Sequence, residues 1–166
     1  MSLKIACLSD THGYFDKRLK EFIGYCDEIW HAGDIGSTGV AEELSSMKPL
    51  RAVHGNIDGA DIRASYPEHQ RFSAGGLDVW ITHIGGYPGR YDRSVVPAIF
   101  EAPPGLFICG HSHILKVIND SKLGLLHINP GAAGRAGAHK VQTAVRFVIE
   151  EGVVKDLEVA ELERTC

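Results

Sequence analysis

Residues 3–10 read LKIACLSD, an apolar run that ends in polar residues. Short apolar runs bounded by polar or turn-forming residues predict buried β-strands. Five further runs of this form follow along the chain: EIWHAGD (28–34), LRAVHGN (50–56), DVWITH (78–83), GLFICGHSH (105–113) and LGLLHINPG (123–131). We therefore expect six strands that have chemically useful side chains at or near their ends.

Helical patterns lie between the early runs. Apolar residues at helical spacing predict one helix at Leu19, Phe22, Ile23 and Cys26, and a weaker stripe predicts a second at Val40, Leu44 and Met47. A third helix is expected over Arg90 to Phe100, with Pro97 in its first turn or at a kink. The element order is then βαβαβ in the first half and mostly strands in the second.

The C-terminal part predicts a hairpin. Residues 141–163 read as two strands that turn at Glu151 and Gly152, and the pair Gly75 and Gly76 predicts an earlier hairpin. No repeat or linker interrupts the chain, so we expect one domain over residues 1–166. The predicted fold class is α/β (α+β), with two sheets that share one core and helices outside.

Composition is that of an ordinary globular protein. Of 166 residues, 44% are hydrophobic and 23% charged, and the formal net charge is −4. This charge argues against binding of long nucleic acids, which requires clustered lysine and arginine. Small anions remain suitable ligands, because a local site can be positive on an acidic protein.

Cysteine usage and hydropathy indicate the compartment. The cysteines are Cys7, Cys26, Cys109 and Cys166. They have neither C-x-x-C spacing nor the density of a disulfide framework, which is typical of buried thiols in a reducing compartment. No secretion signal and no apolar run of about 18 residues occurs. We expect a cytoplasmic protein without membrane contact, and the sequence leaves a homo-oligomer open.

Seven possible metal ligands stand where these strands end. In open α/β sheets the carboxyl ends of the strands line the crevice that binds ligands. The side chains there are Asp10, His12, Asp34, Asn56, His83, His111 and His113. They offer only oxygen and nitrogen atoms, which favours Mn²⁺, Fe²⁺, Ni²⁺ or Zn²⁺. With one bridging carboxylate they form eight bonds, four for each of two ions, so the count predicts a binuclear site.

Spacing supports a shared cavity, although simpler interpretations exist. In the D-x-H pair at 10–12 and the H-x-H pair at 111–113, an extended backbone would point both side chains to one side. One histidine of the second pair could instead be a core residue and the other a solvated one. Asp34 and Asn56 would also suit turns or helix N-caps. Each fragment alone is a weak signal, and their joint order favours the metal site.

The order D-x-H, G-D, G-N, a lone histidine and G-H-x-H resembles the calcineurin-like metallophosphoesterase superfamily. With GNID at 55–58 and NPG at 129–131, residues 3–160 look similar to its small bacterial and archaeal phosphodiesterase branch. The resemblance implies a four-layer αββα sandwich of two mixed sheets. It also implies two divalent ions, manganese first among the candidates. Asp34 would bridge them, with Asp10, His12 and His113 on one ion and Asn56, His83 and His111 on the other.

Two departures from the superfamily pattern concern the substrate. Many members have a histidine directly after G-N that helps to protonate the leaving group, whereas this chain has Ile57. We therefore expect good leaving groups to be cleaved faster than alkoxides. The segment HIGGYPGRY at 83–91 also differs from its relatives and is expected to reshape the substrate pocket.

The expected function is hydrolysis of a small phosphodiester by a metal-bridging hydroxide, with Asp34, Asn56, His83 and His111 as catalytic residues. Two divalent ions, two aspartates and a hydroxide leave a charge of +1, which matches a diester. A phosphomonoester would need added cations, and the candidates are Arg90 and Arg93. A phosphomonoesterase remains an alternative. So does a protein-binding scaffold, because a subunit of membrane-trafficking coats shares this fold.

The remaining histidines are interpreted as structural residues. They are His31, His54, His69, His127 and His139, of which His54 could also orient a ligand. Asn129 and Arg135 could approach the cavity or belong to a simple turn. Metal occupancy is expected to fall below about pH 6.5, because protonated imidazole does not bind metal.

Overall fold

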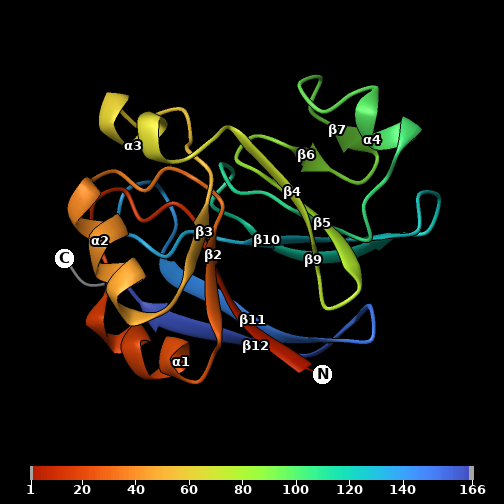
Figure 1. The fold of residues 1–166 in the computed structure, drawn as a ribbon. Coiled ribbons are helices and arrows are strands. Elements are labelled where there is room, and N and C mark those ends of the chain that lie inside the picture. Colours follow the sequence, from red (N-terminus) through yellow and green to blue (C-terminus); the bar gives the residue numbers. More distant parts are fainter. Residues whose placement is uncertain (1, 165–166) are drawn as a thin grey trace.

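Two five-stranded sheets face each other in the computed structural model, which describes residues 2–164 (Figure 1). The first comprises Ser2–Leu8 (β1), Glu28–His31 (β2), Leu50–Ala52 (β3), Val141–Glu150 (β11) and Val153–Glu163 (β12), in the order β12-β11-β1-β2-β3. The second comprises His69–Ala74 (β4), Leu77–Thr82 (β5), Leu106–Ile108 (β8), Leu115–Asp120 (β9) and Leu125–Pro130 (β10), in the order β4-β5-β8-β10-β9. Both sheets mix parallel and antiparallel pairs.

The main core lies between the two sheets. Alternate residues of β1 point to opposite faces, so Ile5 and Cys7 pack toward the second sheet while Ala6 and Leu8 pack toward the helices. Trp30 contributes a large, fully buried ring to the core between the sheets. The sandwich is therefore held together by apolar burial on both faces of the first sheet.

Helices cover the outer face of the first sheet. They are the short Lys17–Leu19 (η1) and Lys20–Gly24 (α1), followed by Thr38–Met47 (α2) and Ala60–Ser65 (α3). The fourth layer is thin: Val95 and Ile99 near the single-turn helix Ala98–Glu101 (α4) pack on Trp80 and Phe107 of the second sheet. Among residues 2–164, no helix has the length and apolar character needed to span a membrane.

The six predicted strands, the first two helices and both hairpins are confirmed. The third predicted helix, Arg90 to Phe100, is wrong except at its end. Residues Gly86–Tyr87 (β6) and Arg90–Tyr91 (β7) instead form a small hairpin, and Pro97 stands at the N-cap of α4 because proline cannot continue a helix. Besides β6 and β7, the elements α3 and β9 were not predicted.

Candidate metal centre

All seven predicted ligands lie on loops that follow strands β1, β2, β3, β5 and β8. Two groups of ligand atoms form there, each with all atoms within 4.8 Å of one another. The groups are Asp10, His12 and His113, and Asp34, His83 and His111. Asn56 joins the second group, because its Oδ1 atom lies 3.1 Å from Nδ1 of His111. The parallel strands therefore bring together donors that are far apart in sequence.

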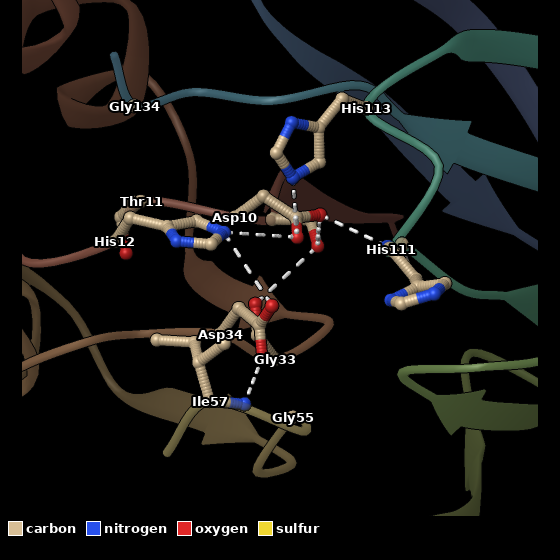
Figure 2. Close-up of polar contacts among 12 residues, drawn as sticks. Asp10, Thr11, His12, Gly33, Asp34, Gly55, Ile57, His111, His113 and Gly134 are labelled. Carbon is tan, nitrogen blue, oxygen red and sulfur yellow. Dashed lines mark hydrogen bonds and ion pairs between the residues drawn. The ribbon is translucent and has the colours of Figure 1, made fainter. Parts of the chain in front are cut away.

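Asp34 connects the two groups, and Figure 2 shows its contacts with His12 and with the backbone of Ile57. Its Oδ2 atom lies 3.4 Å from Nε2 of His12 and 3.2 Å from Nε2 of His83, one from each group. Its Oδ1 atom accepts a hydrogen bond of 3.0 Å from the backbone N–H of Ile57. One oxygen is thus held by the backbone while the other faces both sets of imidazoles.

Asp10 is held in the same way. Its Oδ2 atom accepts hydrogen bonds from the Ser9 hydroxyl at 2.6 Å and from the backbone N–H of His111 at 3.0 Å. Its Oδ1 atom points to the imidazoles, 3.2 Å from Nε2 of His113 (Figure 2). Both carboxylates are almost completely buried, with Asp10 0% and Asp34 2% exposed.

The donor set fits divalent cations. Oδ1 of Asp10 and Nε2 of both His12 and His83 are buried and have no hydrogen-bond partner. Unpartnered polar atoms are costly inside a protein, and more so when charged. Within the described residues, no lysine or arginine pairs with either carboxylate. Cations bound between these atoms would remove the cost, which is the physical basis for assigning the site to metal.

Electrostatics keep the carboxylates ionised. Burial raises the pKa of Asp34, but His83 and the Ile57 N–H outweigh it, so the pKa is lowered. The Asp10 pKa is lowered in the same way, where burial opposes and His113 favours the charged form. Burial lowers the pKa of His83, yet the two carboxylates raise it overall. In the metal-free protein, protons therefore compete for the metal position.

The backbone at the site is left-handed rather than extended. Positive φ angles occur at five predicted ligands: Asp10 (54°), His12 (46°), Asp34 (55°), His111 (72°) and His113 (62°). Such angles are uncommon for non-glycine residues and are typical of functional sites. The backbone at 10–12 and 111–113 is therefore not extended, and the predicted reason for the convergence of these side chains is wrong. The second pair also divides, with His113 in one group and His111 in the other.

Asp58 is a supporting residue that the sequence analysis missed. Its buried carboxylate accepts hydrogen bonds from the N–H groups of Ile35 (3.1 Å), Gly36 (2.8 Å) and Gly55 (2.8 Å). It therefore joins the loop that carries Asp34 to the loop that carries Asn56. The segment GNID was the available signal, since the aspartate follows the asparagine by two residues.

Three further side chains hold the ligand loops. Nδ1 of His31 accepts from the N–H of Gly33, and its Nε2 lies 3.0 Å from the hydroxyl of Thr11, which donates to the carbonyl of Ile35. The amide of Asn129 donates to the carbonyl of Gly110 and so supports the 111–113 loop. These contacts lie behind the ligands rather than among them.

Of the other histidines, only His139 contacts a member of the two groups within the described residues: its ring lies edge-on to that of His113, with centroids 5.3 Å apart. Nδ1 of His54 lies 2.8 Å from the carbonyl of Tyr66, and His69 accepts from the indole of Trp80. His127 is buried, and His139 lies 2.8 Å from the carbonyl of Gly134. Arg135 lies over the ring of Tyr14, with its guanidinium carbon 3.7 Å from the centroid.

Two cavities flank the second group. The first, of about 300 Å³, is lined by His111, Tyr87, Ile114 and Lys116, and is called the Tyr87 cavity below. The second, of about 360 Å³, is lined by His83, Asn56, Arg63 and Glu68, and is called the Arg63 cavity. They adjoin at Ile84 and Asp92, which line both. Of the two expected cations, Arg90 lines a separate cavity with Phe100, and Arg93 lines neither.

A sandwich of two mixed sheets with carboxylates and imidazoles gathered at the ends of its parallel strands defines a class of metal-dependent hydrolases. Residues 3–152 match the calcineurin-like phosphoesterase superfamily domain, and the chain belongs to that superfamily. It is similar to a probable metallophosphoesterase of Methanothermobacter thermautotrophicus, with 28% identity over 77% of this chain and 76% of the relative.

Solved structures share the fold. One is described as a novel archaeal phosphodiesterase, with a TM-score of 0.71, 23% identity, and coverage of 97% of this chain and 99% of that one. Another is Chaetomium thermophilum Vps29, with a TM-score of 0.73, 15% identity, and coverage of 98% of this chain and 100% of that one. The expected αββα sandwich is thereby confirmed.

Proposed function

We propose that the protein is a phosphodiesterase with a binuclear metal centre. Asp10, His12, Asp34 and His113 would hold one ion, and Asp34, Asn56, His83 and His111 the other. The observation that carries the proposal is the position of the Asp34 Oδ2 atom, which faces an imidazole of each group. A carboxylate in this position suits the bridge that a two-metal site requires.

The donor types favour a first-row divalent ion such as manganese, with iron, nickel and zinc as alternatives. When bound, the ions would supply an activated water and would neutralise charge on the phosphate. The chain prepares for this by orienting its ligands. Nδ1 of His83 donates to the carbonyl of Ala32 at 2.8 Å, which leaves Nε2 free to face the site.

The residue after Asn56 offers no proton to a leaving group. The side chain of Ile57 is 48% exposed and apolar, and only its backbone N–H takes part in the site. The ester oxygen must therefore leave without an acid at this position. We infer that the rate depends strongly on the pKa of the leaving group and that aryl esters are cleaved faster than alkyl esters.

A diester suits the space and the charge. Two adjoining cavities lie beside the second ligand group, so each suits one of the two ester groups on phosphorus. The guanidinium of Arg63 donates through Nε and Nη2 to the backbone carbonyls of Asp58, Gly55 and Asn56, so these N–H groups are directed at the backbone rather than at a phosphate. Two divalent ions, two aspartates and hydroxide would leave a charge of +1, equal and opposite to that of a diester.

The test uses purified protein reconstituted with Mn²⁺. Metal analysis should find about two ions per chain. Turnover of bis-p-nitrophenyl phosphate should exceed that of p-nitrophenyl phosphate by about tenfold, the effect of about 1.4 kcal/mol in transition-state stabilisation. Comparable turnover of both compounds would favour a phosphomonoesterase. Protein that binds no metal would contradict the proposal.

A protein-binding scaffold is the second candidate, because the structural match to Vps29 covers 98% of this chain. Metal-loaded protein that cleaves neither compound would favour it. We further propose one metallophosphoesterase domain over residues 1–166, since a common core joins the two sheets. The three described cysteines, Cys7, Cys26 and Cys109, are buried and free, which supports a cytoplasmic location; Cys166 lies outside the described residues.

A further inference from the structure

The Tyr87 cavity begins at a proposed metal ligand. His111 lines it, so an ester group on phosphorus at the centre would lie at its opening. Its volume of about 300 Å³ is at the lower end of the range for small-molecule pockets, which suits one ring system rather than a large cofactor. The cavity therefore has the position and the size of a subsite for one substituent of the substrate.

The walls of this cavity present apolar side chains to solvent. Tyr87 is 41% exposed and Ile114 is 61% exposed, although both are large and apolar. Nζ of Lys116 lies 4.0 Å from the centroid of the Tyr87 ring, a cation–π contact within the same cavity. An exposed aromatic ring with a cation beside it is suited to stacking against a second ring.

The β6–β7 hairpin, which carries Tyr87, is anchored on the second sheet. Within it, the hydroxyl of Tyr91 donates to Asp120 at 2.7 Å. The ring of Tyr91 also packs against Phe107, with centroids 5.9 Å apart. A side chain at Gly85 would place its Cβ 2.6 Å from the Phe107 ring, so the hairpin lies directly on the sheet. Because the hairpin is anchored, its backbone need not be ordered when a ligand stacks on the Tyr87 ring, which lowers the entropy cost of binding.

The second cavity has a different character. Arg63, Glu68 and His54 line it, so its walls are mainly polar and charged. Such walls suit a polar substituent better than an aromatic one. The two sides of the proposed centre thus differ in the ester group that each one suits.

We propose that the Tyr87 cavity binds a planar aromatic group, an aryl ring or a nucleobase, on the ester substituent that stays on phosphorus. This inference rests on the proposed phosphodiesterase function and names the substrate class of that site. Tyr87 is then a specificity-determining residue, contributed by the segment that departs from the superfamily pattern.

The test compares p-nitrophenyl esters of methyl phosphate, phenyl phosphate and thymidine 5′-phosphate, using Mn²⁺-loaded protein. All three release the same leaving group, so only the retained group differs. Tyr87→Ala should reduce kcat/KM about tenfold for the phenyl or thymidine ester and less than about twofold for the methyl ester. Tyr87→Phe should keep the wild-type values. Because each compound is compared between variants, differences in intrinsic reactivity cancel.

Tyr25→Ala is the matched control. Tyr25 is 59% exposed and lies beside Lys4, whose Nζ is 4.3 Å from its ring centroid, in the α1–β2 connection. This variant should leave all three values unchanged. Equal losses on all esters in Tyr87→Ala, or no loss on any, would overturn the inference.

The inference can fail or survive separately from the proposed function. If the wild-type protein cleaves none of the esters, the phosphodiesterase proposal fails, and binding is measured instead by calorimetry. Phenyl phosphate that binds about tenfold more tightly than methyl phosphate, with the difference lost in Tyr87→Ala, would still support an aromatic subsite. Equal binding of the two compounds would overturn it.

Discussion

Asp34 and His83 join the two sheets of the protein at the proposed centre. Oδ2 of Asp34, from the loop after β2, lies 3.2 Å from Nε2 of His83, from the loop after β5. The fit is close, because a side chain at Gly33 would place its Cβ 2.7 Å from Nδ1 of His83. The site therefore forms only when the two sheets pack against each other.

Replacing Asp34 by asparagine should disrupt both ligand groups. Asparagine keeps the size of the side chain but removes the charge and one of the two oxygens that face the imidazoles and the Ile57 N–H. Metal content should fall from about two ions per chain to one or fewer. Phosphodiesterase activity should fall by at least about 100-fold, as measured with bis-p-nitrophenyl phosphate. Asp78→Asn, at an exposed aspartate paired with Arg71, is the control.

Gly55→Ala should displace Asp34 without removing any ligand. A Cβ atom at Gly55 would clash with Oδ1 and the backbone nitrogen of Asp34, so this proposed ligand would have to move. Metal titration should show at least about tenfold weaker binding, comparable to the loss of a group that orients a ligand. Gly59→Ala is the matched control, because nothing lies within 4 Å of a Cβ there. Equal metal affinity in the two variants would contradict this account.

Asp58→Asn should weaken both folding and metal binding. The carboxylate accepts from three backbone N–H groups, and an asparagine would turn an NH₂ toward at least one of them. We expect a loss of about 2–4 kcal/mol in the free energy of unfolding, measured by urea denaturation of metal-free protein. Asp61→Asn, on the exposed side of α3, should change it by less than about 0.5 kcal/mol. An Asp58→Asn variant as stable as the wild type would show that the hydrogen bonds of Asp58 are not needed to hold the two loops together.

Stability should depend on pH through two buried histidines. Burial lowers the pKa of His31 and of His127 to about 4, whereas an unfolded histidine has a pKa of about 6.5. Between these values the unfolded chain binds protons that the native protein does not bind. Each histidine therefore lowers the free energy of unfolding as pH falls, by about 1 kcal/mol per pH unit.

His127→Leu isolates one of these contributions. Urea denaturation of the variant and the wild type, with a metal chelator present, should be compared between pH 7 and pH 4.5. The site histidines His83 and His113, whose pKa values are raised and whose effect has the opposite sign, remain in both proteins. The variant should lose stability less steeply by about 1 kcal/mol per pH unit. If the free energy of unfolding fell equally steeply with pH in both proteins, burial would not lower the pKa of His127.

The elements that sequence predicted well are those with a strong local pattern. The run LKIACLSD and the hairpin at Glu151 and Gly152 are recognisable from a few consecutive residues. The helix predicted over Arg90 to Phe100 failed because, of the residues at helical spacing there, Ile99 is buried whereas Val96 and Phe100 are exposed, and only Ala98–Glu101 is helical. Propensity and spacing were overridden by the hairpin that packs on the sheet.

The sequence by itself determined the chemistry of the centre: which donor atoms are present and that they stand where strands end. Both follow from side-chain identity and from hydropathy over short windows. The resemblance already divided the ligands between two groups. Tertiary structure alone decided how closely they approach one another, that Asp58 joins two loops, and that Tyr87 borders a cavity. Asp10 and His111 are 101 residues apart, yet a hydrogen bond of 3.0 Å joins them. Such contacts arise from the packing of the whole chain, which no local pattern encodes.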